Sequence, residues 1–265
     1  MIAHERLGQG EPIVLLHGLG SDREVWRPVR DRLAGELEVL PVDLPGFGES
    51  VPLAQPAVPT PRALAGAVAE LLDELGIDRA HLAGNSLGGW VAVELARMGR
   101  ARSLTLLSPA GLWRHSTPTG ARVALLASRT LAQRLNRWVP ALLGNPVGRT
   151  LLLWHVIGRP WRMSTDEAVS MSRSMADCPG FHPTFQALRH QRITDARDLG
   201  VPITVAFGAR DFLLLAHQAR LTDELPEGVT IRTIPGCGHV PTFDNPPLIA
   251  ELILAGTRRA QSTDR

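Results

Sequence analysis

The sequence has no lysine and no tyrosine, and only two cysteines among its 265 residues. Cys178 and Cys237 lie far apart and form no C-x-x-C pair, so they suggest neither a disulfide framework nor a zinc site. The N-terminal residues lack a basic region followed by a long apolar run. No segment reaches the roughly 20 apolar residues that span a bilayer. We therefore expect a cytoplasmic protein that carries no metal.

Because lysine is absent, all 28 basic side chains are arginines, and they balance 26 acidic side chains to a net charge of +2. No basic helix is interleaved with aromatic residues, which disfavours nucleic-acid binding. The chain is long enough for one large α/β domain or a domain with an insertion, and its 44% hydrophobic content is ordinary for a folded core.

Short apolar strands alternate with amphipathic helices at both ends of the chain. This alternation predicts a mostly parallel sheet with helices on both faces. Between residues 112 and 194 only helical patterns occur, at 121–138, 147–157, 166–175 and 185–192. We therefore predict an α/β core formed by residues 1–111 and 196–265, with an inserted helical lid at 112–195. The predicted strands are at 2–6, 13–16, 38–42, 81–83, 103–107, 203–207 and 229–234; late helices are expected at 214–225 and 247–254, and a disordered tail at 257–265.

Charge is segregated between the two predicted parts. Between Trp113 and Arg192 there are 11 arginines and three acidic residues, so this segment carries about +8. Three of the six tryptophans also fall inside it. Two interpretations are open: the arginines cover solvated helix faces, which we favour, or they dock the lid on an anionic membrane.

The pentapeptide Gly84-Asn85-Ser86-Leu87-Gly88 lies between a short apolar strand and an apolar helix. This context is typical of a nucleophile elbow, in which the serine occupies a strained turn at the N-terminus of a helix. The small residues Gly84 and Gly88 let strand and helix pass closely. The pattern predicts that Ser86 attacks a carbonyl carbon.

A serine hydroxyl needs a base that takes its proton, usually a histidine held by a carboxylate. Asp211 directly follows the predicted strand at 203–207, and His239 lies in a glycine-containing loop after the strand at 229–234. The alternatives are that Asp211 caps a helix and that His239 is an ordinary loop residue. Asp43 also ends a strand, but the breaker-rich turn after it indicates a structural role.

Two backbone N–H groups are expected to form the oxyanion hole. One belongs to Leu87, the residue after the nucleophile, and the other to Leu19, in the loop after the strand at 13–16. His17 in that loop is expected to order the loop by hydrogen bonding. No cofactor-binding motif is present.

Five motifs in combination resemble the α/β-hydrolase superfamily. The resemblance implies a cofactor-free serine hydrolase with an acyl-enzyme at Ser86, His239 as base and then acid, and Asp211 orienting His239. Epoxide hydrolases and haloalkane dehalogenases of this superfamily use aspartate at the elbow, so Ser86 argues against both. The motifs are HGLG at 17–20, DLPGFGES at 43–50, GNSLGG at 84–89, GARD at 208–211 and GCGHVP at 236–241.

The GNS-x-GG motif is also similar to that of the meta-cleavage-product C–C hydrolases. Two departures count against that subgroup: the loop at 17–22 is not of the HGGGPG type, and Val240 stands where a tryptophan is common. An arginine inside the pocket would favour the acidic C–C substrate.

The sequence thus predicts hydrolysis of a carboxylic ester with a small or medium apolar acyl group. C–C hydrolysis and cofactor-free perhydrolysis are the alternatives within the enzyme class, and a ligand-binding protein is the alternative outside it. The expected partner is a small-molecule ester, with no nucleic acid and no membrane; the oligomeric state is left open.

Overall fold

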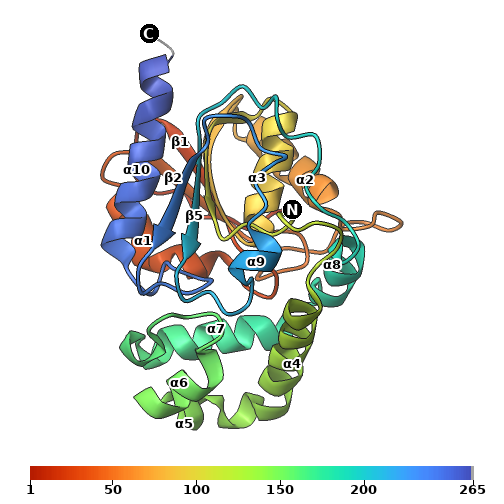
Figure 1. Cartoon of the computed structure of the whole chain (residues 1–265), viewed down its shortest axis with the longest axis vertical. Helices are drawn as coiled ribbons and strands as arrows, with labels where there is room; N and C mark the ends of the chain where they lie inside the picture. Colours follow the sequence, from red (N-terminus) through yellow and green to blue (C-terminus); the bar gives the residue numbers. More distant parts are fainter. Residues whose placement is uncertain (264–265) are drawn as a thin grey trace.

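The computed structural model describes residues 1–263. Six strands form one sheet in the order β2-β1-β3-β4-β5-β6, and every neighbouring pair is parallel (Figure 1). All residues of β3 and β5 are buried, as expected for a parallel sheet covered on both faces. The predicted α/β class is therefore confirmed. The strands are β1 Pro12–Leu16, β2 Glu38–Val42, β3 Ala80–Asn85, β4 Ala101–Leu107, β5 Ile203–Gly208 and β6 Thr230–Ile234.

Helices cover the sheet from two sides. Helices α2 and α3 contribute to one buried hydrophobic cluster, while α1 and α10 contribute to the other (Figure 1). Thr60 caps α2 by accepting from the Ala63 N–H, and Asp22 caps the 3-10 turn that precedes α1. The bounds are η1 Arg23–Trp26, α1 Arg27–Leu33, α2 Pro61–Glu74, α3 Leu87–Arg97, α9 Ala216–Ala219 and α10 Pro246–Thr263.

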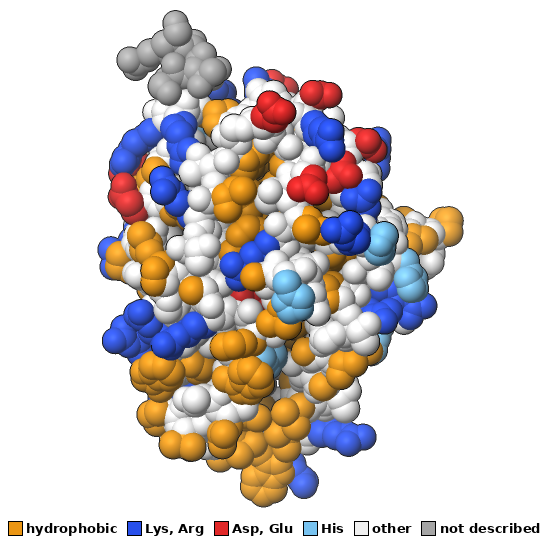
Figure 2. All heavy atoms as spheres, viewed as in Figure 1, with side chains coloured by type: hydrophobic (Ala, Val, Ile, Leu, Met, Phe, Trp, Pro, Cys, Tyr) orange, Lys and Arg blue, Asp and Glu red, His pale blue; other side chains and the backbone are white. Residues whose placement is uncertain are grey.

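The predicted helical segment between β4 and β5 forms a lobe beyond the carboxyl ends of the strands (Figure 1). Hydrophobic side chains gather on the surface of this lobe, and acidic side chains gather over the opposite end of the molecule (Figure 2). Helix α8 instead packs Phe181 and Phe185 into the cluster shared with α2 and α3. The division into core and lid stays a prediction. The bounds are α4 Thr119–Leu135, η2 Asn136–Trp138, α5 Val139–Leu143, α6 Pro146–Leu153, η3 Pro160–Arg162, α7 Thr165–Asp177 and α8 Phe181–Leu188.

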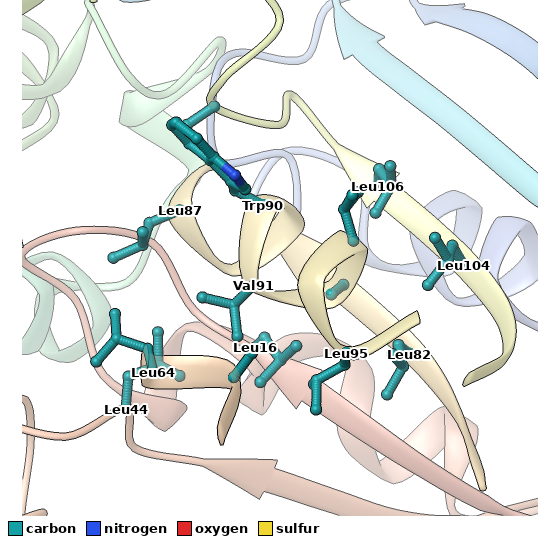
Figure 3. Close-up of a cluster of buried hydrophobic side chains, with 14 of the residues drawn as sticks. Leu16, Leu44, Leu64, Leu82, Leu87, Trp90, Val91, Leu95, Leu104 and Leu106 are labelled. Carbon is teal, nitrogen blue, oxygen red and sulfur yellow. The ribbon is translucent and has the colours of Figure 1, made fainter. Parts of the chain in front are cut away.

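Helix α3 is fixed tightly against the sheet. Its side chains Val91 and Leu95 point toward the strand residues Leu16 and Leu82 (Figure 3). Ten consecutive residues of α3, from 87 to 96, are buried. Such burial holds the residue before α3 in a fixed position above the strand ends.

Several predicted elements differ from those in the structure. Residues 2–6 form no strand and make only isolated antiparallel bridges to β2, at His4 and Leu7. The helix predicted at 214–225 is limited to α9, because the Leu221 N–H bonds to the Leu112 carbonyl and draws the chain away from a helical path. Helix α8 begins at Phe181, four residues before the start of the helix predicted at 185–192.

The predicted disordered tail is helical as far as Thr263, and residues 264–265 lie outside the described part of the chain. The guanidinium of Arg259 donates to the hydroxyls of Thr204 and Thr230, which attaches the last turns of α10 to β5 and β6. None of the helices within residues 1–263 is long and apolar enough to cross a bilayer.

Candidate active site

Ser86 occupies the turn between β3 and α3, with φ 54° and ψ −115°. A positive φ is strained for a residue with a side chain. Two glycines make the turn possible. A Cβ on Gly84 would lie 2.3 Å from the Gly88 carbonyl oxygen, and a Cβ on Gly88 would lie 2.1 Å from the Leu16 carbonyl oxygen. The backbone thus presents the Ser86 side chain at the carboxyl end of β3.

His239 and Asp211 form a buried pair. The His239 Nδ1 lies 2.9 Å from the Asp211 Oδ2. The other carboxylate oxygen, Oδ1, accepts from the N–H groups of Leu213 at 3.0 Å and Leu214 at 2.8 Å. The turn after β5 therefore fixes the carboxylate and leaves Oδ2 for the imidazole.

Burial opposes ionisation of Asp211, but the adjacent His239 and the hydrogen bonds from His239 and Leu214 outweigh it. The pKa of Asp211 therefore lies below its ordinary value. The carboxylate is charged at neutral pH.

Asn85 ties the histidine loop to the elbow. Its side-chain amide donates to the His239 carbonyl at 2.8 Å and to the Leu107 carbonyl at 3.0 Å. The sequence motif contains Asn85, but its pattern does not indicate this role, because His239 lies 154 positions away.

Ser86 and His239 line one cavity of about 390 Å³. The His239 Nε2 is buried and has no hydrogen-bond partner among the described residues. Leu19 and the neighbouring Gly18 line the same cavity, and a Cβ on Gly18 would lie 3.2 Å from the Ser86 Cβ. The fold thus brings together Ser86, His239 and the loop of Leu19, with Asp211 behind the histidine and Leu87 directly after the serine.

The cavity walls are mainly leucine, alanine, valine and methionine side chains. Within residues 1–263, neither an arginine nor a carboxylate lines this cavity. The volume falls in the range of about 300–1,000 Å³ typical of small-molecule sites. The site fits an uncharged, apolar ligand.

His155, in the turn after α6, is a polar group that sequence reasoning missed. It lines the cavity, and its Nε2 lies 2.9 Å from the Ser128 Oγ of α4. Burial lowers the pKa of His155, and the nearby His239 lowers it further, so the imidazole is neutral at pH 7. No sequence spacing links positions 128 and 155, because only the tertiary fold brings α4 and the turn after α6 together.

Asp43 and His17 have the structural roles that the sequence predicts. Asp43 is buried, and its carboxylate accepts from the N–H groups of Arg23 at 2.7 Å and Glu49 at 3.0 Å, which closes the turn after β2. The His17 Nε2 accepts from the Leu44 N–H at 2.9 Å. Neither residue lines the cavity. Across the described chain, no group of three or more His, Cys, Asp or Glu is arranged to hold a metal ion.

Two known relatives align with most of this chain. The chain is 35% identical to the epoxide hydrolase EphH of Mycobacterium tuberculosis over 202 residues, which is 72% of this chain and 91% of that protein. It is 29% identical to the pimeloyl-[acyl-carrier protein] methyl ester esterase of Methylococcus capsulatus over 259 residues, covering 94% and 95% of the two chains.

A solved structure, the thermophilic esterase from Thermogutta terrifontis, superposes with a TM-score of 0.76 at 25% identity, over 98% of this chain and 93% of that one. Residues 13–252 match the alpha/beta hydrolase family from the first strand to the last helix. The chain therefore belongs to the alpha/beta hydrolase family and is a hydrolase.

Proposed function

We propose that the protein hydrolyses carboxylic esters of apolar acyl groups through an acyl-enzyme at Ser86. The observation that carries the proposal is a buried Asp211–His239 pair whose free imidazole nitrogen faces the same uncharged cavity as Ser86.

In the proposed reaction, the His239 Nε2 takes the proton of the Ser86 hydroxyl while the oxygen attacks the ester carbonyl carbon. Asp211 holds the proton on Nδ1 and stabilises the imidazolium. The negative charge that develops on the carbonyl oxygen is met by the N–H groups of Leu87 and Leu19, at the N-terminus of α3 and in the loop after β1.

The tetrahedral intermediate then collapses. The C–O bond to the alcohol breaks, and His239 returns its proton to the departing alcohol oxygen. A water molecule, deprotonated in turn by His239, attacks the acyl-enzyme carbonyl and releases the free acid with regeneration of Ser86. The products are one alcohol and one carboxylic acid for each water consumed.

The cavity walls support an ester over the acidic substrate of a C–C hydrolase. An acidic dienoate carries a carboxylate, and burying it without a cationic partner is costly. Among the described residues, no arginine lines the cavity to meet such a charge. The two histidines that line it are His155 and the proposed base His239.

The relative EphH is named an epoxide hydrolase, and an epoxide is the second candidate substrate. Ser86 favours the ester. Epoxide hydrolases of this superfamily use an aspartate at the elbow, because a carboxylate can open the ring without first losing a proton.

A panel of p-nitrophenyl esters of increasing acyl length, with an acidic dienoate and a styrene-type epoxide, tests the proposal. Wild type should hydrolyse at least one ester, and Ser86→Ala should lose nearly all of that rate. Ser116→Ala, a serine outside the cavity, is the matched control and should keep it. Turnover of only the dienoate or only the epoxide would reject the ester assignment.

A further inference from the structure

The segment from α4 to η3 exposes many large apolar side chains. Trp138 is 53% exposed, Val147 67% and Leu151 70%. Soluble proteins rarely leave large contiguous apolar areas facing water, and such areas mark interaction sites. We call these side chains the apolar patch: Val123, Leu126, Leu131, Trp138, Leu142, Val147, Leu151, Trp154 and Trp161.

All charged side chains of the same segment are arginines. Residues 119–162 contain seven arginines and no acidic residue, and the chain has no aspartate or glutamate between Glu94 and Asp166. Two of these arginines are buried, whereas Arg134, Arg137 and Arg162 are exposed. The Arg137 guanidinium lies 5.1 Å from the centre of the Trp138 ring. Hydrophobic side chains cover this end of the molecule, with arginines at its margin and no acidic side chain over it (Figure 2).

We propose that the apolar patch docks on the surface of an anionic phospholipid bilayer. Tryptophan rings favour the boundary between headgroups and acyl chains, aliphatic side chains enter that boundary, and arginines pair with lipid phosphates. The sequence alone favours arginines on solvated helix faces. The exposure of the apolar side chains between them changes that interpretation, because three tryptophans that are about half exposed leave a large apolar area in contact with water.

Charge argues against a second copy of this chain as the occupant of the patch. A symmetric contact through the patch would bring the exposed arginines of both copies together, with no acidic residue in the segment to pair with them. An anionic bilayer instead offers lipid phosphates to the exposed arginines.

The mouth of the active-site cavity lies within the patch. Leu131, Leu151 and Trp154 belong to the patch and also line the cavity. Phe212, beside the proposed acid Asp211, is 51% exposed, and its ring centre lies 5.4 Å from that of Trp154. Docking would therefore place the cavity rim against the lipid, so that an apolar substrate could enter from the bilayer. Docking goes beyond the proposed hydrolysis and does not require it.

Co-sedimentation with sucrose-loaded vesicles tests the proposal. Vesicles of phosphatidylcholine with about one third phosphatidylglycerol should pellet the protein, pure phosphatidylcholine should pellet much less, and binding should weaken as salt rises from about 0.1 M to about 0.5 M. Equal binding to both vesicle types, or none to either, would overturn the proposal.

Variants locate the contact. Arg134→Gln with Arg137→Gln, and separately Trp138→Ser with Trp161→Ser, should each weaken partitioning to the anionic vesicles by about tenfold or more. Val51→Ser with Val58→Ser removes two side chains that are each 59% exposed outside the patch, and should change nothing. Thermal unfolding and circular dichroism check that each variant is folded.

Two further experiments separate membrane docking from the proposed chemistry and from dimer formation. Ser86→Ala should pellet as wild type does, so that a failure of the proposed chemistry leaves the binding result intact. Size-exclusion chromatography should give a monomer. A dimer that the tryptophan variants dissociate, without loss of vesicle binding, would assign the patch to a second copy and overturn the proposal.

Discussion

At the scale of single residues, the proposed chemistry depends on the tautomer of His239. Asp211 accepts from its Nδ1, while the N–H groups of Leu213 and Leu214 hold the other carboxylate oxygen. An asparagine at 211 would keep the shape of the carboxylate but lose its charge and present an amide group to the imidazole.

We therefore expect Asp211→Asn to lower kcat for the best ester by about 10³- to 10⁴-fold with little change in KM, as loss of the orienting carboxylate does in other serine triads. Steady-state kinetics measures both constants. Asp223→Asn, at an exposed position, should leave both unchanged. A loss below about tenfold at 211 would remove Asp211 from the mechanism.

The residues of the site differ in how far the sequence predicts them. Ser86, Asp211 and His239 each follow a strand and stand in short motifs, so a local pattern is enough to propose them. Asn85, Ser128 and His155 act through partners 22 to 154 positions away. Such contacts arise from tertiary packing, which no local pattern encodes.

At the scale of elements, α3 must cross β1 at very close range. A Cβ on Gly88 would lie 2.1 Å from the Leu16 carbonyl oxygen, whereas a Cβ on Gly66, inside α2, would meet nothing within 4 Å. Both glycines are helical, and only Gly88 lacks room for a side chain, so Gly66 serves as the control for a substitution at Gly88.

Gly88→Ala should lower the free energy of unfolding by about 3 kcal/mol or more, because backbone atoms on both sides would have to move apart. Gly66→Ala should raise it by about 0.5–1 kcal/mol, because alanine restricts the unfolded chain and fits the helix. Urea unfolding curves measure both changes. Equal effects at the two positions would contradict the close crossing of α3 over β1.

His17 joins two loops at the strand ends. Burial lowers its pKa below the ordinary value, although the hydrogen bond with the Gly18 carbonyl and the nearby Asp43 and Asp22 oppose this shift. The Nε2 accepts from the Leu44 N–H and therefore carries no proton in the folded protein. The unfolded chain gains a proton at this site below about pH 6.5, where the folded chain still resists protonation. The free energy of unfolding should therefore fall as the pH drops below about 6.5.

His17→Asn should be less stable than wild type at pH 8 and should lose less of its remaining stability between about pH 7 and pH 5. Urea unfolding at a series of pH values measures this slope. Substitution of the exposed His115 by asparagine serves as the control and should leave the slope as in wild type. An unchanged slope in His17→Asn would show that His17 does not titrate with folding.

The extents of the elements show the limits of local patterns. The predicted bounds of the strand at 38–42 agree with those of β2. Helix α9 is shorter than predicted and α10 longer, because both ends are set by contacts with distant residues such as Leu112, Thr204 and Thr230.

At the scale of the whole molecule, two properties depend on how the helices between β4 and β5 are placed. They close the cavity over Ser86 without bringing an arginine into it, and they expose tryptophans and arginines on the outside. The sequence predicts the net charge of this segment, but not which of its side chains face the cavity, the core or the solvent.

The claim that joins these scales is that Ser86 is a nucleophile activated by His239. Peptide mass spectrometry after brief treatment with a fluorophosphonate tests it most directly, with Ser86→Ala and His239→Ala treated in parallel. We expect one adduct per chain on the peptide that holds Ser86, no adduct in Ser86→Ala, and much slower labelling in His239→Ala. Labelling at another residue, or ester turnover that persists in Ser86→Ala, would contradict it.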